Sequence, residues 1–355
     1  MHFRLYYKYK HFLKRNSLTG GNMTKLEELL KHIRNDHVYI QTHNFPDPDA
    51  IGSAFGLQHL LRHKGIDSTL CYYGKVDRQS TKQMIEKLHI DIKHSDDCGM
   101  KHSDEIILVD AQRGNSNLLD IIGEEIICID HHPILIEPVN YRYMDIRPSI
   151  GACCSIIADY FFENNIPLTA DVATALIQGI KVDTANLTRA VSQLDLDMYY
   201  NLFNLSRIKL LEELDHSTLQ LSDLRAYAHA IQSIQCFGDV SFAYTGKGCP
   251  DTLVANISDF MLEMIEVNFS IVYSIIRDGI KLSIRSNPAY YDAGLVTLYA
   301  LDGIGAGGGH STMAGAFIPF KNWNEYELLD TVRKRYMDTL DRLYPFRKKK
   351  ELSQS

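Results

Sequence analysis

The stretch HNFPDPDAIGS, residues 43–53, decides how the first half of this 355-residue chain is interpreted. An apolar run at residues 37–42 comes before it and predicts a β-strand. After it, residues 49–64 have helical periodicity and end at Gly65, a residue that commonly follows the end of a helix. The stretch is therefore a loop between the end of a strand and the start of a helix.

The same alternation continues along the chain. The runs that predict further elements are, in order, 68–73 (strand), 79–88 (helix), 105–109 and 125–129 (strands), and 151–164 and 169–179 (helices). Strands that alternate with helices form parallel sheets with helices on both faces. We therefore predict an α/β fold whose larger N-terminal parallel-sheet domain covers residues 23–195.

The pattern changes after about Asp195. Residues 196–235 carry Leu, Tyr and polar residues at helical spacing without strand signals, so we predict a helical linker there. Residues 236–345 predict a second, smaller α/β domain. In this part Asp278-Gly279 separates two apolar runs, which is typical of a β-hairpin, and a strand at 316–320 and a final helix from about Trp323 follow.

The two ends differ from the rest of the chain. Residues 1–22 contain basic side chains and no acid, and they predict a disordered extension or a basic nucleic-acid arm. Thr24 and Glu27 have the spacing of a capping box, so the first ordered helix is expected to begin there. Residues 346–355, with their basic run, predict a disordered tail.

Composition limits the classes of function. Lys and Arg number 37 and Asp and Glu number 44, so the net charge is −7, and an acidic chain binds long duplex nucleic acid poorly. No run approaches the roughly 18 apolar residues of a membrane span. The seven cysteines contain no CxxC pair and do not indicate a disulfide framework. We expect a cytoplasmic protein without membrane or long-duplex partners.

Acidic residues and histidines follow the predicted strands. In a parallel α/β sheet, ligands bind beyond the carboxyl ends of the strands. The residues at such positions, or after the helix ending near residue 179, are His43, Asp47, Asp49, Asp110, Asp130, His131, His132 and Asp183. Each alone has a structural explanation; Asp47 and Asp49, for example, could form a turn and a helix N-cap.

Taken together, these side chains predict a metal site. Carboxylates gathered at one edge of a sheet repel each other unless cations neutralise them. Imidazole mixed with carboxylate suits first-row metals, and a carboxylate-rich set favours Mn²⁺ over Zn²⁺. The set is large enough for two ions that share one aspartate, an arrangement that promotes in-line attack on phosphorus. We therefore expect two Mn²⁺ ions, for which Mg²⁺ could substitute.

In their order and spacing, these residues resemble the four motifs of the DHH phosphoesterase family. The matching segments are 43–53, Val109-Asp110, Asp130-His131-His132 and 179–184. In the second half, Gly307-Gly308-Gly309-His310 resembles the GGGH signature of the smaller substrate-binding domain of that family, the DHHA1 domain. The resemblance covers about residues 24–345. It implies a DHH domain and a DHHA1 domain joined by a linker, with the active site between them.

The resemblance also implies a role for each residue. The ligands expected for the first Mn²⁺ are His43, Asp47 and Asp110. Those expected for the second are Asp49, Asp110, His131 and Asp183, so Asp110 would bridge the two ions. His132 would face the scissile phosphate. Asp130 would contribute to catalysis by orienting the two histidines.

In the second domain, Arg285 and the glycine loop are expected to bind substrate. Glycines let backbone N–H groups approach phosphate closely, and a helix starting at His310 would add the positive end of its dipole. Arg285 could hold phosphate with two parallel hydrogen bonds, although by itself it could be a solvated charge at a strand end. The full expected set is Arg285, Gly307, Gly308, Gly309 and His310.

The two-domain length is most similar to the oligoribonuclease (nanoRNase) and pAp-phosphatase branch of the family. That branch trims very short RNA and removes the 3′-phosphate of adenosine 3′,5′-bisphosphate (pAp), and close relatives split linear or cyclic di-adenylate. We therefore expect a phosphoesterase of short nucleotides that uses a hydroxide bridging two metals. The alternatives are a manganese inorganic pyrophosphatase, whose second domain would lack GGGH, and an inactive nucleotide sensor, which would lack a ligand. A homodimer is compatible with the sequence.

Overall fold

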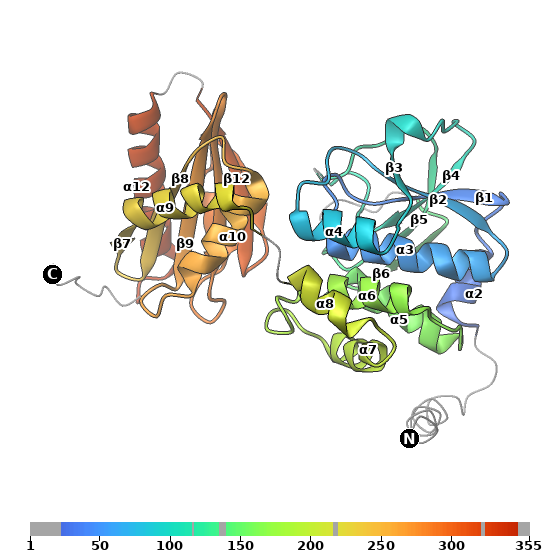
Figure 1. Cartoon of the computed structure of the whole chain (residues 1–355). Coiled ribbons are helices and arrows are strands. Elements are labelled where there is room, and N and C mark those ends of the chain that lie inside the picture. The colour runs from blue at the N-terminus through green and yellow to red at the C-terminus, as the bar shows by residue number, and fades with distance from the viewer. Residues whose placement is uncertain (1–22, 116, 135–139, 216–218, 321–323, 347–355) are drawn as a thin grey trace. The chain divides into compact units, whose positions relative to one another are not determined.

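The computed structural model describes residues 23–115, 117–134, 140–215, 219–320 and 324–346. The chain divides into two compact units, one up to residue 218 and one from residue 219. Each unit is built on its own six-stranded sheet (Figure 1). The predicted α/β fold class is confirmed. The predictions of disorder for residues 1–22 and for 347–355 of the tail lie outside the described residues.

The sheet of the first unit is entirely parallel. Its strands are β1 (His37–Gln41), β2 (Asp67–Tyr72), β3 (Ile92–His94), β4 (Glu105–Val109), β5 (Glu124–Asp130) and β6 (Tyr143–Ile146). Their order is β3-β2-β1-β4-β5-β6, so the direction in which strands are added reverses between β1 and β4. In open α/β sheets, ligands bind at the carboxyl ends of the strands where the order reverses.

The α-helices of this unit pack on one face of the sheet. They are α2 (Lys25–Leu30), α3 (Pro48–His63), α4 (Gln79–Lys87), α5 (Cys153–Glu163), α6 (Ala170–Asp183), α7 (Gln193–Phe203) and α8 (Ile208–Asp215). Their apolar side chains form one core with strand residues that include Ile40, Ile107 and Val109. Figure 1 shows α3, α5 and α6 together along this face.

The opposite face of the sheet is covered by loops and a short 3₁₀ helix (Ser95–Asp97), so the prediction of helices on both faces is wrong for this unit. On this face Ile106 and Leu108 pack against the loop residues Leu118 and Ile121. Because crossovers between parallel strands are right-handed, connections before and after the reversal fall on opposite faces. The described residues of the β4–β5 and β5–β6 connections contain no helix.

The second unit has a mixed sheet in the order β11-β12-β10-β9-β8-β7. Its strands are β7 (Gln235–Phe237), β8 (Val240–Lys247), β9 (Phe269–Ile276), β10 (Gly279–Ser286), β11 (Ala306–Gly309) and β12 (Met313–Pro319). Its α-helices are α9 (Leu224–Ser233), α10 (Asp251–Leu262), α11 (Ala293–Ala300) and α12 (Glu325–Leu343). Helices α11 and α12 contribute to the core on one face, and α9 and α10 to the core on the other.

Two local predictions are confirmed. Thr24 and Glu27 form a capping box at the start of α2: the Thr24 hydroxyl accepts the Glu27 N–H, and the Glu27 carboxylate accepts the Thr24 N–H. Asp278-Gly279 lies at the turn between the antiparallel strands β9 and β10. Local side-chain and turn chemistry alone determines both features.

Residues 196–235, expected to be a separate linker, are largely helical but divide between the two units. Met198 and Leu202 of α7 and Leu211 of α8 belong to the core of the first unit. Ala226 and Ala230 of α9 pack on the second unit. The helical spacing of apolar residues indicates a helix with one buried face, but it does not indicate which sheet that face covers.

Among the described residues, no helix combines the length and the apolar character needed to cross a bilayer. All seven cysteines are described, and each has a free thiol.

A buried carboxylate joins three segments of the first unit. Asp145 in β6 accepts hydrogen bonds from Lys25 Nζ (2.9 Å), Arg147 Nη2 (2.7 Å) and the Tyr160 hydroxyl (2.8 Å). Arg147 also donates to Asp159 on α5 (2.8 Å). Burial alone would raise the pKa of Asp145, but Arg147 and Lys25 outweigh burial and lower this pKa. The cluster therefore ties β6 and α2 to α5.

Asp145→Asn should lower the free energy of unfolding at neutral pH by about 3 kcal/mol, because it removes a charge partner from the mostly buried Arg147. A carboxylate with a lowered folded-state pKa stabilises the fold above its unfolded value of about 4, and this contribution is lost as pH falls through the folded value. The difference in the free energy of unfolding between variant and parent should therefore become smaller in acid.

Urea unfolding over a descending series of pH values measures this effect. Asp96→Asn, at an exposed carboxylate, is the control. A difference for Asp145→Asn that stays constant from neutral pH into acid would contradict the assignment.

Candidate metal centre

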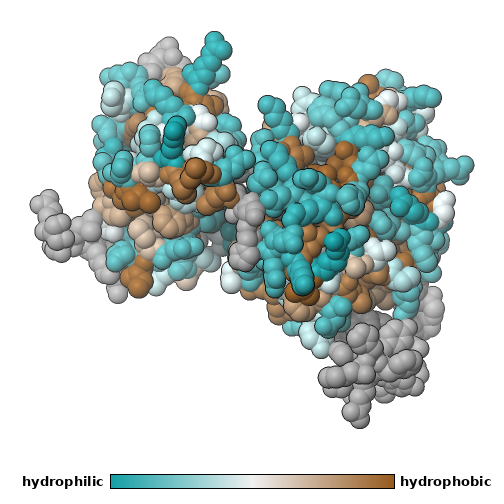
Figure 2. Space-filling view, in the orientation of Figure 1, coloured by the Kyte–Doolittle hydropathy of each residue, from teal (hydrophilic) through white to brown (hydrophobic). Residues whose placement is uncertain are grey.

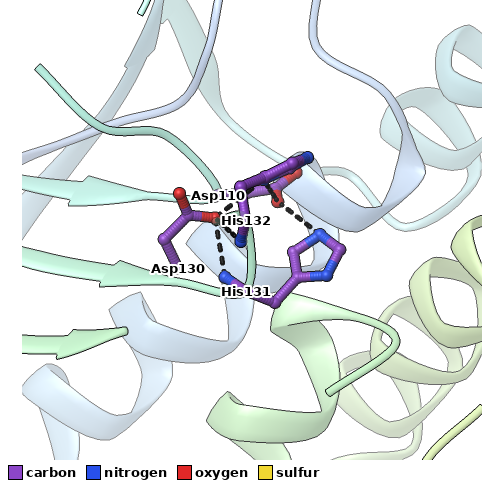
Figure 3. A group of neighbouring side chains, drawn as sticks. All are labelled: Asp110, Asp130, His131 and His132. Atoms are coloured by element: carbon purple, nitrogen blue, oxygen red, sulfur yellow. Dashed lines mark hydrogen bonds and ion pairs between the residues drawn. The ribbon is translucent and has the colours of Figure 1, made fainter. Parts of the chain in front are cut away.

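The predicted ligands meet where the strand order reverses. His43 lies just beyond β1, Asp110 directly follows β4, and Asp130 ends β5 and is followed by His131 and His132. Because β1, β4 and β5 are neighbouring parallel strands, their carboxyl ends share one edge. Figure 3 shows the side chains from β4 and β5 turned toward one another. The structure groups the potential ligands as His43-Asp47-Asp110, Asp49-His131-Asp183 and Asp110-Asp130-His131-His132.

Asp110 lies between two histidines. Its Oδ2 atom is 3.5 Å from His43 Nε2, and its Oδ1 atom is 3.3 Å from His131 Nε2. The residue is 1% exposed and has a φ of 56°, in the left-handed region that residues other than glycine seldom adopt. The carboxylate therefore has one oxygen toward each group of ligands, as expected of a bridging ligand.

Asp47 is placed to serve both as a helix N-cap and as a metal ligand, the two roles considered from the sequence. It is the N-cap of α3, where its Oδ1 atom accepts the N–H groups of Asp49 (3.0 Å) and Ala50 (3.2 Å). The same oxygen lies 3.8 Å from His43 Nε2. The start of the helix therefore fixes this carboxylate beside the first histidine.

Asp49 is held by the beginning of a different helix. It is fully buried, and its two oxygens accept the backbone N–H groups of Cys153 (2.7 Å) and Cys154 (2.8 Å), the first residues of α5. Backbone N–H groups at a helix N-terminus favour a negative charge. Its Oδ2 atom lies 3.8 Å from His131 Nε2. The packing of α5 thus places this carboxylate.

Asp183 comes from a helix rather than from a strand end. It is the last residue of α6, which extends beyond the predicted end near residue 179, and its Oδ2 atom is 3.3 Å from His131 Nε2. Gly179, one turn earlier, allows α6 to approach α3, because a Cβ there would lie 2.9 Å from the Asp49 Cα atom and would also collide with the Cys154 sulfur. The glycine brings the two carboxylates to the same histidine.

Hydrogen bonds to main-chain carbonyls determine how two of the histidines face the site. His43 Nδ1 bonds the Asn44 carbonyl (2.8 Å), and His131 Nδ1 bonds the Ile150 carbonyl (3.2 Å). Since a carbonyl can only accept, each Nδ1 carries the proton. In the neutral imidazole, Nε2 then offers its lone pair toward the carboxylates, as a metal ligand requires.

His132 is oriented differently. Its Nδ1 atom is 2.9 Å from Asp130 Oδ1, which also accepts the backbone N–H groups of His131 (2.7 Å) and His132 (3.2 Å) (Figure 3). The other oxygen of Asp130 accepts from Gln112 Nε2 (2.8 Å). Asp130 is fully buried, and both oxygens are engaged, so it positions the two histidines. We therefore treat it as a positioning residue.

The charges of the site favour a bound cation. Burial disfavours the charged forms of His43 and His131, but neighbouring aspartates, Asp110 among them, outweigh burial and raise the pKa of both. The pKa of Asp49 lies well above its usual value, first because of burial and then because of the carboxylates of Asp110 and Asp183. Buried carboxylates thus oppose one another's ionisation, and a divalent cation supplies the positive charge that stabilises them.

Two buried atoms that lack hydrogen-bond partners indicate that the residues fit a metal. Asp110 Oδ1 and His131 Nε2 are both buried and have no hydrogen-bond partner among the described residues. Buried polar atoms are normally paired, so two lone pairs that lack a donor here are suited to a shared cation. These atoms belong to two separate residues that face each other. The donor set therefore fits divalent metal ions.

Two residues that support the site were not predicted. Gln112 also donates to the His132 carbonyl (2.9 Å), and Asp195 accepts the Gly151 N–H (2.8 Å), next to the carbonyl that holds His131. Gln112 has no sequence signal apart from lying two residues after Asp110. Asp195 belongs to a capping box with Ser192, a local signal that could have identified its helix start but not its link to the site.

In the second unit, several predicted substrate residues meet in one pocket of about 460 Å³. Arg285, Gly308, Gly309 and His310 are among its lining residues. Gly308 has open space where a Cβ would lie, whereas Cβ atoms at Gly307 and Gly309 would collide with neighbouring strands or helices. The middle glycine thus keeps the pocket open, and Gly307 and Gly309 allow close packing.

The predicted helix start at His310 is wrong. Residues 306–309 form β11, and the chain then turns directly into β12. The nearby helix N-terminus is that of the preceding helix α11, where the N–H groups of Ala293 and Gly294 already donate to the carbonyls of Ser311 (2.8 Å) and His310 (2.9 Å). This helix end is therefore satisfied by the main chain. The three consecutive glycines did not reveal the strand because glycine has no side chain to show period-two burial.

Arg285 is not a solvated charge. It is 9% exposed, and its Nε atom donates to Asp259 (2.7 Å). Its Nη1 atom donates to the Ser283 hydroxyl and the Ile284 carbonyl (both 3.1 Å). The guanidinium is thus fixed within the wall of the pocket.

Comparisons with known proteins show what this chain is similar to. Residues 37–180 match the DHH family, N-terminal domain. Protein MJ1633 of Methanocaldococcus jannaschii is 30% identical over 294 residues, which are 82% of this chain and 60% of that protein. A probable manganese-dependent inorganic pyrophosphatase of Streptococcus thermophilus is 28% identical over 150 residues, 41% of this chain and 48% of that protein. The chain thus spans about half to three fifths of the length of these relatives.

Two solved structures share the fold. An exopolyphosphatase-related protein from Bacteroides fragilis superposes with a TM-score of 0.71 at 19% identity, covering 91% of this chain and 99% of that one. RecJ from Thermus thermophilus, in complex with Mn²⁺, gives a TM-score of 0.52 at 14% identity, covering 89% of this chain and 54% of RecJ. Residues 37–180 of the chain are therefore similar to the DHH family, N-terminal domain, and the chain shares its fold with these two structures.

Proposed function

We propose that this chain is a manganese-dependent phosphoesterase that hydrolyses short nucleotides, namely very short oligoribonucleotides, pAp and di-adenylate. The observation that carries the proposal is the buried Asp110 carboxylate, whose two oxygens face His43 and His131. A carboxylate shared by two sets of ligands suits a pair of metal ions about 3.5–4 Å apart, an arrangement found in phosphatases and nucleases.

The residues that would hold the ions are those of the two ligand groups. His43, Asp47 and Asp110 would hold one ion, and Asp49, Asp110, His131 and Asp183 the other. When bound, the ions would activate water and stabilise negative charge on the phosphoryl oxygens. Manganese is favoured by the mixed imidazole and carboxylate donors. It is also favoured by the relative from Streptococcus thermophilus, which is named a probable manganese-dependent enzyme.

His132 would supply a proton at the phosphate. Asp130 accepts the Nδ1–H of His132, which fixes the orientation of the ring. Burial lowers the pKa of His132, but Asp130 and Asp110 outweigh burial and raise it. An imidazolium of this kind can protonate a leaving oxygen as a general acid. Asp130 and Gln112 keep the ring in place.

The pocket of the second unit supports a nucleotide over a smaller substrate. Its volume of about 460 Å³ falls in the usual range for small-molecule sites. Lys281 and His310 contribute polar groups to its lining, and the bare backbone of Gly308 adds open space. We propose that it binds the part of the substrate that is not hydrolysed.

An inorganic pyrophosphatase is the second candidate, because a relative of this chain from Streptococcus thermophilus is named a probable manganese-dependent inorganic pyrophosphatase. The two activities separate in a panel of pyrophosphate, pAp, di-adenylate and short oligoribonucleotides with Mn²⁺, with the products resolved by chromatography. An inactive nucleotide sensor is disfavoured because all six expected ligand residues are present and lie in the ligand groups.

Removal of divalent metal should abolish hydrolysis. After exhaustive chelation the protein should be inactive on every member of the panel, and Mn²⁺ should restore more activity than Mg²⁺ because of the donor set. Elemental analysis of the reconstituted protein should find two Mn²⁺ ions per chain. Undiminished turnover after chelation would contradict the metal-dependent mechanism.

Asp110→Asn should be far more damaging than Asp130→Asn. Asparagine tolerates the left-handed backbone at residue 110, so the fold should persist while both ions lose a charged ligand. We expect kcat/KM to fall by more than about 100-fold, whereas loss of a supporting partner at Asp130 should cost about 10–100-fold. Metal content and thermal unfolding are measured alongside. Near-normal turnover of Asp110→Asn with two ions bound would refute the bridging role.

Filling the pocket should reduce nucleotide turnover selectively. A Cβ atom at residue 308 would enter open space, so the side chain in Gly308→Leu should occupy the pocket. We expect the ratio of kcat/KM for pAp over that for pyrophosphate to fall by about 10–100-fold, equivalent to losing one charge-assisted hydrogen bond. Ala306→Leu, on the same strand but outside the pocket, is the matched control. If the ratio of kcat/KM for pAp over that for pyrophosphate is the same in both variants, the pocket does not contribute to nucleotide recognition.

A further inference from the structure

A large aromatic side chain is exposed in the middle of the metal-binding loop. Phe45 is 56% exposed, and it lies two residues from His43 and two from Asp47. At about 3.80 Å per residue, its Cα atom is within about 7.6 Å of the Cα atoms of both proposed ligands. A phenylalanine in this position contributes little to the core, so folding alone does not explain it. Figure 2 shows that brown, hydrophobic side chains reach the surface at several places on the first unit.

The backbone at Phe45 is held in an unfavourable conformation. Its φ is 57°, in the left-handed region, and it precedes Pro46, which further restricts its backbone. Hydrogen bonds on both sides keep it there. Asn44 donates its N–H to the Asn117 carbonyl (2.7 Å), and Phe45 donates its N–H to the Tyr73 carbonyl (3.2 Å). Strained positions that are fixed by their surroundings are concentrated at functional sites.

The position of the ring is fixed by a second loop. Three atoms of the Phe45 ring would lie 3.2–3.3 Å from a Cβ atom at Gly74, so the ring rests against backbone that carries no side chain. Gly74 itself has a φ of 84°. Two unusual backbone positions on separate loops thus combine to hold one aromatic ring, carried on the loop that joins His43 to Asp47, while more than half of the residue stays exposed.

We propose that Phe45 is a stacking platform for a nucleobase of the substrate, next to the phosphate that is hydrolysed. The inference rests on the proposed function and narrows it. A flat apolar surface gives no advantage with inorganic pyrophosphate, which has no apolar part, whereas every nucleobase offers a π-face to an aromatic ring. Phe45 therefore selects nucleotides at the first unit, independently of the pocket in the second.

The test compares the full chain and its variants, loaded with Mn²⁺, on two substrates. One is the dinucleotide pApA, and the other is the same phosphodiester between ribose phosphates without bases. In Phe45→Ala, the ratio of kcat/KM for pApA over the base-free diester should fall by about 5–150-fold, as when other base-stacking aromatics are truncated. Phe45→Trp should retain the ratio. Phe45→Leu keeps an apolar side chain but has no flat face, so its ratio should fall as in Phe45→Ala.

Two controls separate stacking from structure. Tyr200→Ala removes a similarly exposed aromatic residue (59%) from α7 and should leave the ratio unchanged. Phe45→Asn relieves the strain, because asparagine tolerates left-handed backbone, and its melting temperature should equal or exceed that of the parent. A lower melting temperature would indicate that Phe45 serves the fold.

The outcomes also separate this inference from the proposed function. A parent that hydrolyses neither diester with Mn²⁺ contradicts the proposed function, and the inference falls with it. An active parent whose ratio is unchanged in Phe45→Ala, or retained in Phe45→Leu, leaves the proposed function intact and overturns the stacking role of Phe45.

Discussion

The structure of the first unit depends on bringing several carboxylates together inside a protein. Asp110 is almost fully buried between two histidines, and Asp49 is fully buried at the start of α5. Isolated buried charges are costly, so each must be compensated by hydrogen bonds, by a partner or by a cation. The reversal of strand order, the close approach of α6 to α3 at Gly179 and the position of α5 all serve this requirement.

Much of this arrangement could be predicted from the sequence. Alternating apolar runs indicated the strands β1, β2, β4 and β5, and capping and hairpin signals indicated Thr24 and Asp278-Gly279, because these patterns depend on local chemistry. His43, Asp110 and His131 followed from a general rule about the ends of parallel strands. The structure places all three in the ligand groups.

The remainder depends on contacts between distant segments. Asp183 was expected just after a helix that ends near residue 179 but is the last residue of α6, because helical periodicity does not fix where a helix stops. The turn after Gly309 was expected to begin a helix, since glycines conceal a strand. Gln112 and Asp195 have no residue pattern that points to their partners 18 and 44 positions away. The division of α7, α8 and α9 between two cores is likewise a tertiary property.

The main-chain hydrogen bonds to the ligands have a consequence for metal exchange. Asp47 and Asp49 are fixed by the beginnings of two helices, and His43 and His131 by two carbonyls, so folding rather than the ion shapes the coordination sphere. Such preorganisation lowers the entropy lost on binding. In a zinc finger, by contrast, releasing the metal unfolds the domain. With the metal ions of the proposed function, the chain would lose and regain them while folded, so the concentration of divalent metal around it, rather than its refolding, would set the fraction of active molecules.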